Sequence, residues 1–196
     1  MSLITLFKLF WSPTAGWQAL LESKPSMPRL FIFHVVPLAS IPPLMIFFTA
    51  ISADSTFLVG TLSPKKLVLV GLILFIIQLM AVPMMALIIK QLGEVVNIKP
   101  SFQSAFTLAA VAPTPLWLSA LLLLAPSFIV LVTFGSLALM ASFGLIYYGL
   151  PLVFEIKGKD NAAMYFGGVM IAGTVALAFL MLSTLVILGS LQNLSI

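Results

Sequence analysis

Long apolar runs separated by short charged segments make up most of the chain. A helix of about 20 apolar residues crosses the hydrocarbon core of a bilayer. Three runs reach that length between charged or polar ends: 30–51, 67–89 and 164–189. Each is predicted to be a membrane-spanning helix.

A longer uncharged stretch lies between Lys99 and Glu155. At about 1.5 Å rise per residue, it is too long for one crossing of a core about 30 Å thick and suits two. Pro126-Ser127 is the turn signal nearest its middle, which predicts spans at 102–124 and 128–152. The chain is therefore predicted to be an all-α membrane protein with five transmembrane helices.

The basic residues indicate an orientation. With five spans, Lys65 and Lys66 lie on one side of the membrane, and the other basic residues lie on the opposite side: Lys8, Lys24, Arg29, Lys90, Lys99, Lys157 and Lys159. The positive-inside rule then places the N-terminus in the cytoplasm and the C-terminus outside. One or three crossings between 100 and 154 would almost remove this bias, so the charges favour two.

Residues 1–27 are predicted to form a cytoplasmic amphipathic lead. Ser12 is placed as the N-cap of a helix that has Pro13 at its first position. One interpretation puts 2–23 in the headgroup layer as a pair of interfacial helices, with Lys8 and Lys24 outward; the alternative, given equal weight, packs the apolar stripe against the bundle. The stripe recurs at helical spacing: Leu3, Leu6, Phe7, Phe10, Trp17, Leu20 and Leu21.

The start of the chain does not resemble a cleaved secretory signal. Lys8 interrupts the first apolar run, and Trp11 and Pro13 follow it. A signal peptide instead has an unbroken apolar stretch before a small-residue cleavage site. We therefore expect the lead to be retained.

Composition narrows the function classes. The chain is 62% hydrophobic and 7% charged, which is typical of an integral membrane protein. It has no cysteine and one histidine, and its five acids all lie outside the predicted spans. Catalysis within the membrane needs paired acids, a nucleophile with its base, or metal ligands. The chain is thus predicted to be non-enzymatic, without metal or other cofactor.

The net charge of +4 comes from basic residues scattered between the apolar runs. Nucleic-acid binding would need them clustered on one face. Their predicted partner is the bilayer itself, through its anionic cytoplasmic leaflet.

Three segments carry a resemblance that extends over nearly the whole length. They are "WSPTAGWQALLESKPS" (11–26), "PSFQSAFTLAAVAPTPLWLSALL" (100–122) and "YYGLPLVFEIKGKDNAAMYF" (147–166). In this order, together with five spans, they resemble the Yip family of Ypt/Rab-interacting membrane proteins, and in particular its short bacterial branch of YohC-like inner-membrane proteins.

The resemblance implies a five-span membrane domain over 28–196, in a bacterial inner membrane, with a cytoplasmic N-terminus. For eukaryotic members it implies binding of Rab GTPases and roles in vesicle traffic and membrane shaping. The lead here is short, and Ala110-Val111 stand where those members have a Gly-Tyr pair before the proline. Rab binding is therefore not carried over to this chain.

Two prolines interrupt the third predicted span. Pro113 and Pro115 have no N–H, which leaves the carbonyls of Ala109 and Val111 without their helical partners. In lipid, broken helix is tolerated only against protein, a hydroxyl or water. Thr114 is predicted to donate its hydroxyl to Val111.

A polar layer is predicted at the centre of the bundle. Gln78 lies halfway along its span, as Pro113 does, and its amide is our candidate donor for the Ala109 carbonyl. The other interpretation, which we favour, is a structural kink, with Gln78 serving only in packing and no solute involved. The proposed layer and helix break comprise Gln78, Pro113, Thr114, Pro115, Ser40, Ser142 and Thr174.

His34 is expected near the headgroups, because it follows Arg29 by little more than one helical turn. A lone histidine cannot build a metal site here. An interfacial hydrogen-bonding role is favoured over a proton relay.

Charged residues in the predicted cytoplasmic loops have two interpretations. They form a docking face for a soluble partner or for lipid headgroups, or they are simply solvated, and we favour solvation. These residues are Lys99, Glu155, Lys157, Lys159 and Asp160.

Gly168, Ala172 and Ala176 in the fifth span follow a small-xxx-small spacing that permits close helix approach. This spacing serves either packing within the bundle, which we favour, or a seam between two copies in a homo-oligomer.

Two function classes follow from the sequence. The preferred one is a non-enzymatic inner-membrane protein of the Yip type that organises the membrane or binds other proteins. The alternative is a small transporter, channel or lipid-moving protein that uses the polar layer around the broken third helix.

Overall fold

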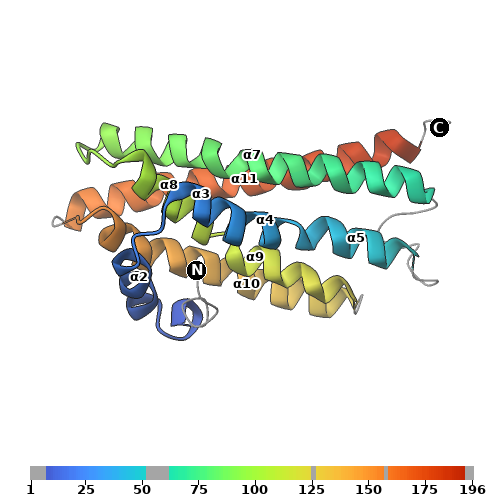
Figure 1. The fold of residues 1–196 in the computed structure, drawn as a ribbon, viewed down its shortest axis with the longest axis horizontal. Helices are drawn as coiled ribbons and strands as arrows, with labels where there is room; N and C mark the ends of the chain where they lie inside the picture. The colour runs from blue at the N-terminus through green and yellow to red at the C-terminus, as the bar shows by residue number, and fades with distance from the viewer. Residues whose placement is uncertain (1–7, 52–61, 125–126, 157–158, 193–196) are drawn as a thin grey trace.

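The computed structural model describes residues 8–51, 62–124, 127–156 and 159–192. This part of the chain is almost entirely helical, and the long helices run along the long axis of the bundle (Figure 1). Five stretches within it are long and apolar enough to cross a membrane: Met27–Ala50, Pro64–Val95, Phe102–Leu124, Phe128–Val153 and Ala163–Ser190. The prediction of an all-α protein with five spans is confirmed.

The second span is the helix α7, Pro64–Val95. It is longer than its predicted run of 67–89 because Lys65, Lys66 and Lys90 lie inside the helix. Long lysine side chains can reach polar surroundings from a helix end, so a charge does not terminate the helix. Pro83 lies within α7 without breaking it.

The first span is divided into short segments: α3 (Met27–Leu30), the π-helix η1 (Phe31–Val35), α4 (Val36–Ala39) and α5 (Ile41–Ile51). Pro37 explains the widened turn, because its ring displaces the carbonyl four residues earlier and it has no N–H to donate. A π-turn of this kind re-aims the side chains that it carries, and His34 is one of them.

The third span is also interrupted. It consists of α8 (Phe102–Val111), α9 (Thr114–Ser119) and the 3₁₀-helix η2 (Ala120–Leu124), with a turn at Ala112 and Pro113. Half of this span is buried inside the bundle, more than in any other described span. The third span is therefore the centre around which the others pack.

The remaining spans are α10 (Phe128–Val153) and α11 (Lys159–Gln192). In Figure 1, α7 and α11 run side by side along one edge of the bundle, and α9 and α10 lie along the other, with the first span between them. Large apolar side chains on α7, α10 and α11 point outward, as lipid-facing side chains do, for example Leu72, Phe134 and Phe179.

The lead helix α2 (Pro13–Glu22) is seated on the bundle. Ser12 and Pro13 occupy the predicted N-cap and first position, although the Ser12 side chain makes no capping hydrogen bond. Trp17 is 0% exposed, and its indole N–H donates to the Leu145 carbonyl of α10 at 3.1 Å. Of the two interpretations of the lead, the headgroup layer or the bundle, the described contacts of Trp17 show packing against the bundle. Leu3, Leu6 and Phe7 lie outside the described residues.

Candidate functional site

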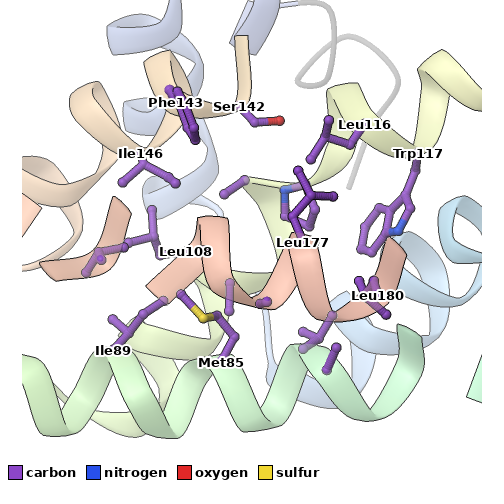
Figure 2. A pocket seen from close by; sticks show the side chains of 18 of the residues that line it. Met85, Ile89, Leu108, Leu116, Trp117, Ser142, Phe143, Ile146, Leu177 and Leu180 are labelled. Carbon is purple, nitrogen blue, oxygen red and sulfur yellow. The ribbon is translucent and has the colours of Figure 1, made fainter. Parts of the chain in front are cut away.

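A cavity of about 130 Å³ lies beside the break in the third span. Figure 2 shows its side chains converging from several helices, with Met85 and Ile89 on α7 opposite Ser142, Phe143 and Ile146 on α10. The third span contributes Leu108, Ala109, Ala112, Pro113, Leu116 and Trp117, and α11 contributes Val169, Gly173, Ala176, Leu177 and Leu180. The lining is almost wholly apolar, and Gln78 and Ser142 are its polar side chains.

The helix break supplies one side of the cavity. Pro113 cannot donate to the Ala109 carbonyl, and the N–H of Ala112 is bonded to Leu108 at 3.0 Å. In the described part of the chain no hydrogen bond reaches the Ala109 carbonyl from a turn or a side chain. Pro115 lies in the first turn of α9, and its missing N–H leaves the Val111 carbonyl to accept from a side chain instead.

Thr114 is the polar link at the break. Its hydroxyl donates to the Val111 carbonyl at 2.7 Å, the bond expected from the sequence. Its oxygen lies 3.0 Å from Nε2 of His34. The tautomer of His34 sets which group donates in this pair, and Nε2–H donates to Thr114 when the Thr114 hydroxyl proton is on the Val111 carbonyl. Both side chains are buried, at 1% and 2% exposure.

The expectation for His34 was wrong in its location. His34 is not in the headgroup layer but inside the bundle, bonded to a residue halfway along the third span. Counting residues from Arg29 fails here because it says nothing of direction, and His34, carried by the π-turn Phe31–Val35, faces its partner on the third span. The structure does give His34 a hydrogen-bonding role.

Gln78 lines the same cavity as Ala109 and Pro113, at the depth inferred from the sequence. The expected hydrogen bond from its amide to the Ala109 carbonyl is absent from the described structure. The two groups border the cavity and do not meet across it. The prediction that the Gln78 amide donates to the Ala109 carbonyl was therefore wrong, although both residues line the cavity.

Two other members of the predicted layer lie elsewhere. The hydroxyl of Ser40 donates to the Pro37 carbonyl at 2.7 Å, and that of Thr174 to the Met170 carbonyl at 2.9 Å. Both bonds stay within the donor's own span, and neither side chain lines the cavity. Each hydroxyl satisfies itself locally, so neither needs a partner on another helix.

The small residues of the fifth span face the bundle. A Cβ on Gly168 would lie 3.5 Å from the Leu92 side chain of α7, and Ala176 lines the cavity. Ala172 is half-buried. These placements accord with the favoured role in packing between α11 and α7.

The predicted docking face is only partly described. Lys99 and Glu155 are exposed at the same end of the bundle as the lead helix. Lys157 lies outside the described residues, as do the side chains of Lys159 and Asp160.

A profile of the family described as the Yip1 domain matches residues 7–180. The chain belongs to the Yip1 domain family. The matched region of this Yip1-family chain contains α2, the broken third span and every residue that lines the cavity. No curated protein and no solved structure matches the chain significantly.

Two contacts of this Yip1-family chain were missed by sequence reasoning. The first is the pair formed by His34 and Thr114, and the second is the seat of Trp17 against Gly149. A polar residue alone in an apolar span was a signal for His34, because it requires a buried partner. The sequence holds no comparable signal that pairs Trp17 with a glycine more than a hundred residues away.

Proposed function

We propose that this Yip1-family chain is a non-enzymatic, membrane-organising protein of a bacterial inner membrane, of the YohC-like type. Its N-terminus is cytoplasmic and its C-terminus lies on the periplasmic or extracellular side. In support, the links that join α2 to α3 and α7 to α8, which carry Lys24 and Lys99, lie at one end of the bundle, and the start of α7, which carries Lys65, lies at the other (Figure 1). The richer end is the cytoplasmic one by the positive-inside rule.

The proposal rests on the position of the lead helix α2, which packs on α10 through the buried side chain of Trp17. Trp17 holds α2 on α10, while Trp11, just before α2, is 94% exposed. Lys8 and Lys24 flank this segment and are also exposed. An exposed tryptophan between lysines suits the boundary of an anionic leaflet, with the ring among headgroups and the ammonium groups on lipid phosphates.

Enrichment of anionic lipid around the lead tests the proposal. In asymmetric vesicles with anionic lipid in the leaflet facing the lead, energy transfer from a labelled protein to a labelled anionic lipid reports local enrichment. Each lysine near the surface contributes about 1 kcal/mol, so the double variant Lys8→Glu, Lys24→Glu is expected to lose most of the enrichment.

Lys65→Glu is the matched control, because it reverses a charge at the other end of the bundle. It is expected to leave the enrichment unchanged. Equal loss in both variants, or no enrichment with the unaltered protein, would contradict the proposal.

A second contact surface, for a soluble protein or for headgroups, is proposed at the charged residues of the predicted docking face: Lys99, Glu155, Lys157, Lys159 and Asp160.

The cavity favours a second candidate function, the movement of a neutral solute or lipid. Interrupted helices at mid-membrane depth are typical of solute sites in transporters. In proteoliposomes, scrambling of a fluorescent lipid between leaflets measures this activity directly. Gln78→Leu removes the amide at the cavity wall and is expected to slow scrambling by up to about tenfold.

Ser40→Ala is the control, since the Ser40 hydroxyl serves only its own turn. An equal scrambling rate for empty and protein-containing vesicles would exclude this second function and leave the first untouched.

A further inference from the structure

The cavity beside the broken third span has a closed end and an open end. At the closed end four buried side chains, none more than 7% exposed, form the wall: Ile89, Leu108, Ile146 and Val169. At the other end Leu116, Leu139 and Leu180 are only half-buried, and the cavity is open on one side. Figure 2 shows Ile89 and Leu108 at one end and Leu116 and Leu180 at the other. The opening therefore lies among the half-buried residues.

The open end faces the hydrocarbon of the bilayer rather than water. Met140 follows Leu139 on α10 and is 68% exposed, and Phe179 precedes Leu180 on α11 and is 63% exposed. Large apolar side chains exposed in the middle of a span face lipid. The cavity is therefore continuous with the lipid-facing surface, and acyl chains are what meets its opening.

The two ends of the cavity also differ in their position along the bundle. The closed end is lined from α8 and the open end from α9, and α8 lies nearer to α2 than α9 does (Figure 1). Acyl chains of the leaflet on the side opposite α2 point toward this closed end, whereas chains of the other leaflet point away from it. The opening is thus oriented to receive chains from one leaflet.

The shape of the cavity suits a chain. Its lining on α11 runs from Val169 to Leu180, which at about 1.5 Å per residue is about 16 Å along the bundle. A volume of about 130 Å³ spread over that length is narrow. Its long direction is that of the helices, which is also the direction of acyl chains in a bilayer. The space therefore fits the end of one chain and excludes a headgroup.

The lining selects an apolar occupant. Among the described residues, no ionisable side chain lines the cavity, and a charged group would lose its hydration there without a counter-ion. The Ser142 Oγ is buried within the wall and is not accessible to an occupant. An unfilled apolar wall forfeits dispersion contacts, and an acyl chain restores them because lipid tails are as apolar as leucine.

We propose that this cavity holds the methyl end of one acyl chain, from a phospholipid of the leaflet on the side opposite α2. The chain enters past Leu116 and Leu180 and ends against Ile89 and Val169. The proposal stands whether or not lipid crosses the membrane, because occupancy of the cavity and movement between leaflets are measured separately.

Phospholipids with bromine atoms near the methyl end of one chain test this proposal, because bromine quenches tryptophan fluorescence at short range. Trp117 lines the cavity, and the background variant Trp11→Phe removes the exposed tryptophan. The full chain is reconstituted in one orientation in asymmetric vesicles. Brominated lipid in the leaflet opposite α2 is expected to quench a component that vanishes on adding Trp117→Phe. The same lipid in the other leaflet is expected to quench this component only weakly.

Gly173→Leu fills the cavity with a side chain. Gly173 lines it, and a Cβ there would approach only the Met85 side chain, at 4.0 Å. This variant is expected to lose most of the Trp117 quenching, because the added side chain occupies the space of the lipid chain. Gly167→Leu is the matched control on α11, outside the cavity, where a Cβ meets nothing within 4 Å. The control is expected to keep the quenching of the parent.

Ala176→Leu fills the same cavity from a second position and replaces Gly173→Leu if that variant does not fold. Helical circular dichroism in mixed micelles establishes the fold of each variant before the vesicles are made. Three results would each overturn the proposal: equal quenching in the cavity-filling and control variants, equal quenching from the two leaflets, or no quenching of Trp117.

Discussion

In the Gly149→Ala variant, α2 is expected to leave its seat on the bundle. A Cβ at this position would lie 2.4 Å from Cε2 and 2.6 Å from Cζ2 of Trp17, closer than real contacts allow. Trp17 is packed on all sides, so the indole must leave rather than shift. The free energy of unfolding is expected to fall by nearly as much as when a core tryptophan is truncated, which costs roughly 3–5 kcal/mol.

Limited digestion with a glutamate-specific protease measures this release, since Glu22 is the last residue of α2 and the Ser23 N–H after it is bonded to the Ala19 carbonyl in the docked helix. The fluorescence of Trp17 is expected to shift to longer wavelength at the same time. Trp11→Phe serves as the background so that the shift belongs to the buried indole.

Gly144→Ala provides the matched control on the same helix, because a Cβ there meets nothing within 4 Å. Alanine is favoured over glycine in a helix interior by about 1 kcal/mol, so this variant is expected to be neutral or stabilising. Equal protease resistance of the two alanine variants would show that the seat of Trp17 does not hold the lead.

Thr114→Val is expected to destabilise the bundle by about 2–4 kcal/mol. The substitution keeps the shape of the side chain and removes its hydroxyl, which takes away the partner of His34 Nε2 and of the Val111 carbonyl. Each buried group left unsatisfied costs about 1–3 kcal/mol. Unfolding followed by helical circular dichroism in mixed micelles measures the change.

Thr107→Val is the control for this experiment. Thr107 is buried in the same span, but its hydroxyl bonds only to the Gln103 carbonyl of its own helix, at 2.9 Å. Its loss is expected to cost no more than about 1 kcal/mol. If both valine variants lose the same stability, the link between His34 and Thr114 contributes nothing beyond a local bond.

The predictable parts of the site were those with local causes. Pro113 predicts its own helix break, and Thr114 lies three residues after Val111, a spacing from which its hydroxyl can return to that carbonyl. The position of His34 could not be obtained in this way. The direction of its side chain depends on the π-turn Phe31–Val35, and its partner lies on another span.

Local rules also failed to separate the members of the predicted polar layer. Ser40, Ser142 and Thr174 lie at similar depth along their spans. Two of them bond within their own spans, whereas Ser142 is buried beside the cavity with its Oγ unpaired in the described structure. The direction of each side chain around its helix decides this, and depth alone carries no information about direction.

The sequence by itself determined the number of spans and the interruption of the third. Both follow from the length of apolar runs against the thickness of the bilayer and from the missing N–H of proline. Only the tertiary structure decided that Trp17 meets Gly149, that His34 bonds to Thr114 and that a cavity forms beside Ser142. A membrane helix is apolar toward lipid and toward its neighbours alike, so its hydrophobic pattern does not reveal which face packs inward.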